Sequence, residues 1–231
     1  MDRVSRPGDA PGPRTLRLAH RGDWRSAPEN TIAAFLAAMA VPACDGIELD
    51  VRRARDGVAV CYHDVTLQRL HGDRRAIAEV TSGELERFGI PTLAAALAAI
   101  PRRAFLDIEL KGDPGHGAFE ALLAGRGPAL ERGVISSFEP ATLERMAGLS
   151  PGWTRWLNAH DASEAAIRTA RELGCRAISV EWHALSRGTV RRVQAAGLDV
   201  AAWTVRRRPT FRRLERLGVV AICAEAAALD G

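Results

Sequence analysis

Two acidic residues stand two positions apart in the short apolar run GIELDV, residues 46–51. In an extended strand successive side chains point to opposite faces, so Glu48 and Asp50 share one face and the apolar side chains share the other. Carboxylates are seldom buried in pairs without a cation or a proton that offsets their repulsion. Taken alone, the run favours a solvated edge strand, and only its neighbours in the sequence make the pair a candidate cation site.

Two histidines are the candidates for proton transfer. His20 ends the run LRLAH, and His63 follows the extended run that starts at Val58. Imidazole has the side-chain pKa nearest neutrality, which suits a general acid or a general base. The alternative for His20 is a buried ring bonded to backbone, but the adjacent Arg21 favours a reactive site.

A third carboxylate and the only lysine of the chain lie in the run FLDIELK, residues 105–111. Glu109 and Lys111 share a face of this strand by the same alternation, although a surface ion pair would show the same pattern. Together with Glu48 and Asp50, Glu109 makes a set of hard oxygen ligands suited to Mg²⁺ or Ca²⁺. Zinc is the alternative metal, but neither histidine occurs in an HxH or HExxH spacing.

The elements that must position these residues alternate regularly along the chain. Eight apolar runs predict strands, and apolar residues at three- and four-residue spacing predict helices between them, the first with Asn30 as its N-cap. The turn signal Asp56–Gly57 predicts a hairpin that returns the chain to His63. The expected strands span residues 16–20, 46–51, 104–110, 133–137, 153–158, 176–181, 198–204 and 219–223, and the expected helices 31–40, 82–88, 90–100, 117–124, 140–147, 162–173, 186–196 and 207–217.

Eight strand and helix units in 231 residues favour a closed parallel (β/α)8 TIM barrel, a single domain with a short insertion after the second strand. Active sites of such barrels collect at the carboxyl ends of the strands. Three consecutive barrel strands end in charged pairs, so we expect one rim to carry His20 with Arg21, Glu48 with Asp50, and Glu109 with Lys111.

Composition and charge narrow the class of protein. The chain is 47% hydrophobic, and its net charge of +4 comes from 32 basic and 28 acidic residues spread along its length, which is not the footprint of a nucleic-acid binder. No run approaches the ~20 apolar residues of a membrane span. Four scattered cysteines without CxxC spacing predict a reduced, cytoplasmic protein. Residues 1–14, which lack the apolar stretch of a signal peptide, predict a disordered leader before a domain over residues 15–231.

Five short motifs in a fixed order resemble the pattern of the glycerophosphodiester phosphodiesterase family. They are HRG at 20–22, PENT at 28–31, ExD at 48–50, HD at 63–64 and ExK at 109–111. The resemblance extends over nearly the whole chain from Leu16 onward. It implies metal-dependent hydrolysis of a small-molecule glycerophosphodiester to glycerol 3-phosphate and an alcohol. The lack of a long apolar run, noted above, predicts no stable membrane insertion.

The resemblance also implies a role for each candidate residue. His20 and His63 would be the general acid and base, and Mg²⁺ or Ca²⁺ would be held by Glu48, Asp50 and Glu109. Lys111 would contact the phosphate, and Trp203 would form an apolar wall of the pocket, with a core tryptophan as the alternative. Independently of the resemblance, the guanidinium of Arg21 can hold the phosphate anion together with Lys111. The attacking group would be the glycerol 2-hydroxyl, which gives a cyclic phosphate that water opens, or water itself.

Two segments at the predicted rim depart from the family pattern and bear on the substrate pocket. Arg206 stands where the family usually has Asn, and Ala224–Glu225 replaces a usual Thr-Asp.

Two alternative functions remain open. One is a related phosphodiesterase that cleaves lysophospholipid or phosphoinositide. Such an enzyme should have an exposed apolar rim, and this sequence has few aromatic residues to form one. The other is a non-catalytic binder of phosphate esters. Loss of a histidine or of a metal-binding carboxylate would favour a binder, and this chain keeps all of them.

Overall fold

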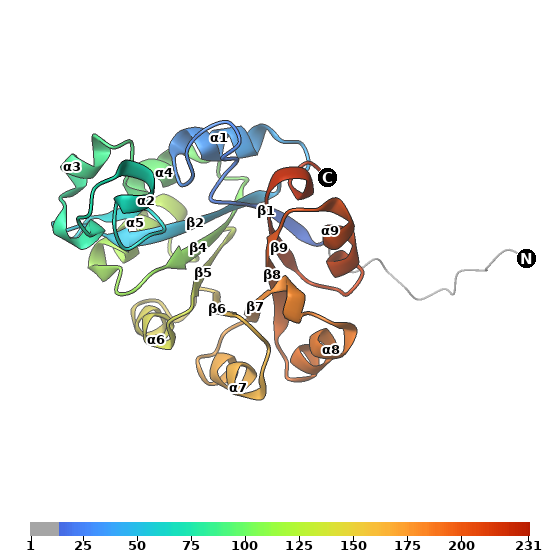
Figure 1. The fold of residues 1–231 in the computed structure, drawn as a ribbon. Coiled ribbons are helices and arrows are strands. Elements are labelled where there is room, and N and C mark those ends of the chain that lie inside the picture. Colours follow the sequence, from blue (N-terminus) through green and yellow to red (C-terminus); the bar gives the residue numbers. More distant parts are fainter. Residues whose placement is uncertain (1–13) are drawn as a thin grey trace, which may run out of the picture.

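The computed structural model describes residues 14–231, in which eight parallel strands close into a barrel (Figure 1). β1 pairs with β9 on one side and with β2 on the other, which completes the ring. The predicted single-domain TIM barrel is confirmed. The expected leader, residues 1–14, lies outside the described residues except for Arg14. The barrel strands are β1 (Leu16–His20), β2 (Gly46–Arg53), β4 (Phe105–Leu110), β5 (Gly133–Ser137), β6 (Arg155–Ala159), β7 (Ala177–Glu181), β8 (Asp199–Val205) and β9 (Ala221–Ala224).

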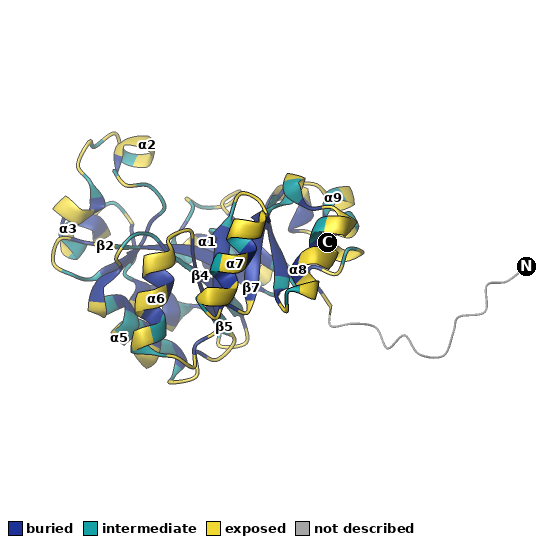
Figure 2. Ribbon diagram, turned by 90° about the horizontal axis from the view of Figure 1, so that it is seen from below, coloured by how far each residue is buried: buried dark blue, intermediate teal, exposed yellow. Residues whose placement is uncertain are grey.

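Helices cover the outside of the barrel, with buried inner and exposed outer faces (Figures 1 and 2). In α8, for example, Val190 and Val193 are buried while Arg191 and Arg192 are exposed, the pattern of an amphipathic helix on an apolar surface. None of the helices in the described part of the chain has the length and apolarity that crossing a membrane requires. The outer helices are α1 (Ile32–Ala40), α4 (Leu93–Ala99), α5 (Gly115–Arg126), α6 (Pro140–Leu149), α7 (Glu164–Glu172), α8 (Arg187–Ala195) and α9 (Arg208–Glu215).

The N-cap of α1 is Thr31, and the prediction that Asn30 caps this helix is wrong. Thr31 Oγ1 accepts a hydrogen bond from the backbone N–H of Ala34 at 3.3 Å. Asn30 instead binds β2, because its Nδ2 donates to Asp50 Oδ2 at 2.8 Å and its Oδ1 accepts from the Asp50 N–H at 3.1 Å. Buried polar groups of β2 need such partners, and the side chain of Asn30 supplies them.

A short insertion after β2 carries His63, as predicted. β3 (Ala59–Cys61) pairs antiparallel with the end of β2 across the Asp56–Gly57 turn. The insertion also contains α2 (Gln68–His71), a 3-10 turn (Ile77–Glu79) and α3 (Ser82–Glu86), of which only α3 was expected from the sequence. A separate apolar cluster that includes Tyr62, Leu67 and Leu85 holds these elements against the barrel wall.

The side chains inside the barrel change from apolar to polar along its axis. The end of the barrel at the amino ends of the strands is filled by an apolar cluster that includes Leu18 and Trp156. Toward the carboxyl ends, the strand register places His20 opposite Glu48, Glu48 opposite Asp107, and Asp50 opposite Glu109. The alternation expected within each strand thus becomes a continuous polar layer across three strands.

Candidate active site

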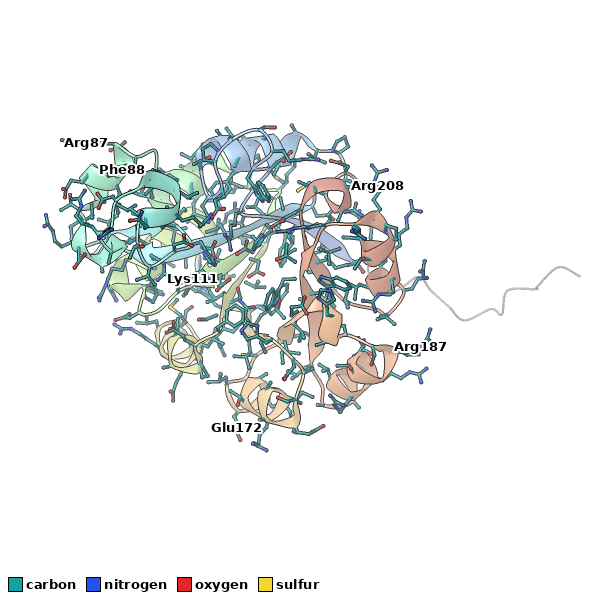
Figure 3. The ribbon with its side chains drawn as sticks, viewed as in Figure 1. Arg87, Phe88, Lys111, Glu172, Arg187 and Arg208 are labelled. Atoms are coloured by element: carbon teal, nitrogen blue, oxygen red, sulfur yellow. The ribbon has the colours of Figure 1, made fainter. Side chains whose placement is uncertain are left out.

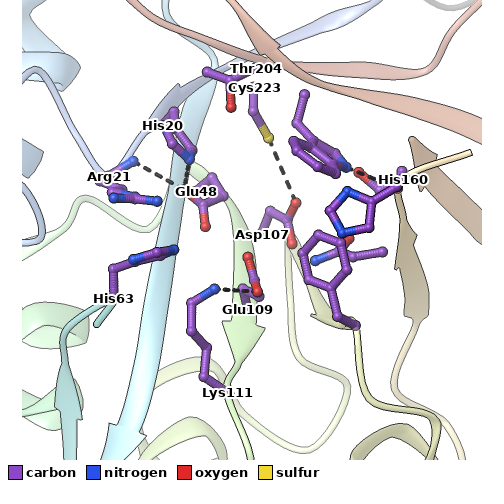
Figure 4. Close-up of a pocket in the computed structure, with 14 residues that line it drawn as sticks. His20, Arg21, Glu48, His63, Asp107, Glu109, Lys111, His160, Thr204 and Cys223 are labelled. Atoms are coloured by element: carbon purple, nitrogen blue, oxygen red, sulfur yellow. Dashed lines mark hydrogen bonds and ion pairs between the residues drawn. The ribbon is translucent and has the colours of Figure 1, made fainter. Parts of the chain in front are cut away.

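A cavity of about 320 Å³ opens at the carboxyl ends of the barrel strands (Figure 4). Asp50 is 1% exposed and lies behind its wall, in contact with Lys111 and Arg21. Lys111 points toward the barrel interior, whereas Glu172 and Arg187 project from the outer helices (Figure 3). The cavity is lined by the other seven side chains predicted from the sequence, His20, Arg21, Glu48, His63, Glu109, Lys111 and Trp203.

Three carboxylates form one cluster at the wall of this cavity. Glu48, Asp50 and Glu109 each offer an oxygen within 4.8 Å of the others, and Glu48 Oε1 is buried without a hydrogen-bond partner. Burial, followed by repulsion from Asp50, raises the pKa of Glu48 well above its ordinary value and also raises the pKa of Glu109. A divalent cation would relieve this repulsion and bind the orphan oxygen, so the donor set fits Mg²⁺ or Ca²⁺.

Two cations border the carboxylate cluster. Lys111 Nζ lies 2.5 Å from Glu109 Oε1 and 3.0 Å from Asp50 Oδ1. Arg21 Nε lies 3.2 Å from Asp50 Oδ2, and its Nη1 donates to Glu29 at 2.9 Å. Burial works against ionisation of Asp50, but Lys111 and Arg21 outweigh it and lower the pKa of Asp50 to about 2. Asp50 is therefore the charged member of the cluster even where Glu48 holds a proton.

Both predicted histidines reach the cavity, and each is held by a carboxylate through Nδ1. His20 Nδ1 lies 2.5 Å from Glu225 Oε1, and His63 Nδ1 lies 2.6 Å from Asp64 Oδ1. Because an ionised carboxylate only accepts hydrogen bonds, Nδ1 carries the proton in both rings and Nε2 is left to face the cavity. His20 Nε2 is 3.9 Å from Glu48 Oε2, which Figure 4 marks with a dashed line.

The sequence reasoning missed Asp107, a further carboxyl group at the floor of the cavity. Asp107 is 2% exposed and its Oδ1 accepts a hydrogen bond from Ser136 Oγ at 2.6 Å. Burial, only partly offset by that bond, raises the pKa of Asp107 to about 7. The available signal was its position in FLDIELK, where alternation puts Asp107 on the same face as Glu109.

Replacing Asp107 with asparagine should stabilise the metal-free protein at alkaline pH. The folded chain holds the Asp107 proton with a pKa of about 7, above the ordinary value of 3.8, so this carboxyl destabilises the fold as pH rises from about 4 to 7. At pH 8 we expect Asp107→Asn to raise the free energy of unfolding by about 1–4 kcal/mol, and at pH 4 to change it little. Urea titrations in EDTA measure both values, with the exposed Glu86→Gln as control. An equal change at the two pH values would contradict the shifted pKa.

The side of the cavity opposite the acids is aromatic. Phe138, His160 and Trp203 form a contacting trio with ring centroids 5.3 to 5.7 Å apart, and Trp203 Nε1 donates to the Ser179 carbonyl at 3.0 Å. Asn158, also missed from the sequence, lines the floor with a buried Oδ1 that lacks a partner. The cavity thus joins a charged wall to an apolar wall, which suits an ester with an anionic centre and a small organic group.

The chain is similar to glycerophosphodiester phosphodiesterases over almost its whole length. The model of the "Glycerophosphoryl diester phosphodiesterase family" matches residues 20–228. The glycerophosphodiester phosphodiesterase of Caldanaerobacter subterraneus is 30% identical over 92% of this chain and 94% of its own. A phosphodiesterase of Oleispira antarctica, solved in complex with the product sn-glycerol-3-phosphate, superposes with a TM-score of 0.82 at 25% identity, covering 91% of this chain and 93% of its own. A Thermotoga maritima glycerophosphodiester phosphodiesterase shares the fold, with a TM-score of 0.78 at 23% identity over 94% of this chain and 96% of its own.

Proposed function

The chain belongs to the glycerophosphoryl diester phosphodiesterase family, and on that premise we propose that it hydrolyses glycerophosphodiesters to glycerol 3-phosphate and an alcohol. The observation that carries this proposal is that a cluster of three carboxylates, of which Glu48 and Glu109 line the cavity and Asp50 lies behind its wall, meets two imidazoles that line the same cavity. The catalytic domain in this proposal spans residues 15–231. We also propose a cytoplasmic location, on the basis of the four scattered cysteines.

In the proposed site, a divalent cation, Mg²⁺ or Ca²⁺, is held by Glu48, Asp50 and Glu109. The orphan Glu48 Oε1 and the raised pKa values of Glu48 and Glu109 support this assignment. When bound, the ion would neutralise charge on the nonbridging oxygens of the phosphate. The ammonium group of Lys111 and the guanidinium of Arg21, both at the same wall, are proposed to bind the phosphate anion beside the carboxylates.

His20 and His63 are proposed to carry the protons of the reaction. One imidazole takes a proton from the attacking oxygen through Nε2, and the other gives a proton to the leaving oxygen. Burial lowers the pKa of His63, although Asp50 and Asp64 act in the opposite direction. A lowered pKa keeps this ring neutral near pH 7, which supports His63 as the base. His20 is then the acid, and to act as one it must carry a second proton on Nε2, which passes to the leaving oxygen while the proton on Nδ1 stays with Glu225.

The organic part of the substrate is proposed to lie against Trp203. This residue shares the cavity with Phe138 and His160, which widen the apolar wall. The glycerol backbone has apolar C–H edges as well as hydroxyls, so it can contact the rings while its hydroxyl groups face the polar floor. Ser179 and Asn158 supply polar atoms at that floor.

A lysophospholipid is the second candidate substrate, because large apolar side chains are exposed on segments that follow the carboxyl ends of three barrel strands, and one of them, Phe138, lines the cavity. Among the described residues, six large apolar side chains are exposed, and four of them lie in the β1–α1 loop, the insertion or the β5–α6 loop. These four are Trp24, Val65, Leu70 and Phe138. The low aromatic content of the sequence led us to expect fewer exposed apolar side chains than these four. Together they offer apolar surface that an acyl chain could contact.

A substrate panel tests the proposed function. Purified protein with Mg²⁺ or Ca²⁺ should release glycerol 3-phosphate from glycerophosphocholine, as measured by an enzyme-coupled assay. Lysophosphatidylcholine is tested in the same panel to separate the two candidate substrates. Val65→Ser changes an exposed residue of the insertion, and Leu36→Ser, an exposed residue of α1, is the control. A higher kcat/KM for the lysolipid that falls only in the Val65 variant would favour the lipid substrate. Absence of turnover on every diester would overturn the proposal.

A further inference from the structure

Arg206 and Glu225, the rim residues at which the chain departs from the family pattern, contact each other. Arg206 Nε donates to Glu225 Oε2 at 2.7 Å. The backbone fixes this arrangement, because the N–H of Glu225 also donates to the carbonyl of Val205 at 2.9 Å. Glu225 is 5% exposed, whereas the Arg206 side chain is 71% exposed. The two departures therefore form one structural unit that connects the surface to the buried rim.

The second carboxylate oxygen of Glu225 contacts the imidazole of His20. Glu225 Oε1 lies 2.5 Å from His20 Nδ1, and the opposite ring nitrogen faces Glu48 and the cavity. Burial opposes ionisation of Glu225, but the bonds from His20 and Arg206 outweigh it and lower its pKa. The carboxylate is thus charged, oriented by an arginine, and bonded to the imidazole.

The same three-part arrangement occurs at the other histidine. His63 Nδ1 lies 2.6 Å from Asp64 Oδ1, and Arg69 Nε donates to Asp64 Oδ2 at 2.6 Å. Arginine, carboxylate and imidazole are thus joined in this order on both sides of the cavity. The carboxylate bonded to His63 belongs to the next residue in the sequence, whereas the carboxylate bonded to His20 belongs to the residue directly after β9, across the closure of the barrel.

We propose that Glu225 is a positioning residue for His20, and that Arg206 fixes Glu225 for this purpose. The inference rests on the proposed role of His20. Glu225 holds the proton on Nδ1 and directs Nε2 into the cavity, as a carboxylate does for a catalytic histidine in other hydrolases. Arg206 limits rotation of the Glu225 carboxylate, and Arg69 limits that of Asp64 in the same way.

Kinetics of four variants test the proposal in the metal-loaded enzyme. Glu225→Gln should lower kcat about 10–100-fold with little change in KM, and Glu225→Asp should restore part of the loss. Arg206→Ala should lower kcat about 2–5-fold, because an exposed ion pair contributes modestly. The exposed neighbour Arg207→Ala removes the same charge and should leave kcat unchanged.

A double variant separates positioning from a general structural role. If Glu225 acts through His20, adding Glu225→Gln to His20→Ala should cause no further loss of kcat. A multiplicative loss in the double variant, or wild-type kcat in Glu225→Gln alone, would overturn the proposal. If Glu225→Gln does not fold, Glu225→Asp and Arg206→Ala decide by the same criterion.

Histidine ¹⁵N NMR supplies a readout that does not need turnover. In its neutral form, His20 of the wild type should show the proton on Nδ1, and Glu225→Gln should weaken or reverse this preference while the His63 signals stay in place. An unchanged His20 tautomer in Glu225→Gln would overturn the proposal. Loss of the Nδ1 proton in a protein that cleaves no glycerophosphodiester would uphold the positioning contact and refute only the proposed activity.

Discussion

Replacing either His20 or His63 with alanine is expected to lower kcat for glycerophosphocholine about 10²–10⁴-fold, the usual contribution of a positioned acid or base. Both rings present Nε2 to the cavity and bind a carboxylate through Nδ1. Neither variant removes a carboxylate of the proposed metal cluster, so metal affinity should change little. Steady-state kinetics with metal titration measure both quantities.

A diester with a good leaving group distinguishes the acid from the base. Glycerol p-nitrophenyl phosphate needs little protonation of its leaving oxygen, so the variant that has lost the acid should recover most of its rate on this substrate. We expect recovery in His20→Ala and none in His63→Ala. His116→Ala, an exposed histidine on α5, serves as the control. Full activity of both active-site variants on glycerophosphocholine would contradict the assigned roles.

Glu48→Gln and Asp50→Asn are both expected to lower kcat/KM about 10²–10³-fold or more, because each removes a charge that would hold the divalent cation. EDTA should reduce the wild type to a similar level, and added Mg²⁺ or Ca²⁺ should restore only the wild type. Retained turnover in EDTA would contradict metal dependence.

The same two variants should change the stability of the metal-free protein in opposite directions at pH 8. The pKa of Glu48 is raised in the fold, so its ionisation destabilises the protein as pH rises above the ordinary value, and glutamine removes that effect. The pKa of Asp50 is lowered to about 2, so its charge stabilises the fold above its ordinary pKa and is lost toward pH 2. Glu48→Gln should therefore raise Tm in EDTA and Asp50→Asn should lower it. Equal shifts in the same direction would contradict the charge distribution.

The barrel and most of its cavity could be predicted because their signals are local. Alternation within GIELDV and FLDIELK placed Glu48 with Asp50 and Glu109 with Lys111, and the structure keeps these pairs on the inner face. The order of the strands followed from the chain, since each barrel strand pairs with its neighbours in sequence and the last pairs with the first. The expected strand bounds differ from the observed ones by at most two residues at either end.

What the sequence could not reveal depends on contacts between distant segments. Glu225 is separated from His20 by 205 positions, and only closure of the barrel brings them together. Alternation within β4 puts Asp107 on the face of Glu109, but its place opposite Glu48 depends on the register of β4 against β2, which no single strand specifies. The local capping preference of asparagine predicted Asn30 as an N-cap. In the structure its side-chain amide instead bonds to the carboxylate and the backbone N–H of the buried Asp50, a contact between distant segments.

The most direct test of the site is an anomalous difference map from crystals soaked with Mn²⁺ and glycerol 3-phosphate. We predict one peak bonded to oxygens of Glu48, Asp50 and Glu109, with the phosphate next to it and with Nε2 of His20 and of His63 directed toward the ester oxygens. A peak elsewhere, or a phosphate bound on the far side of the aromatic wall with both imidazoles turned away, would contradict the proposed chemistry.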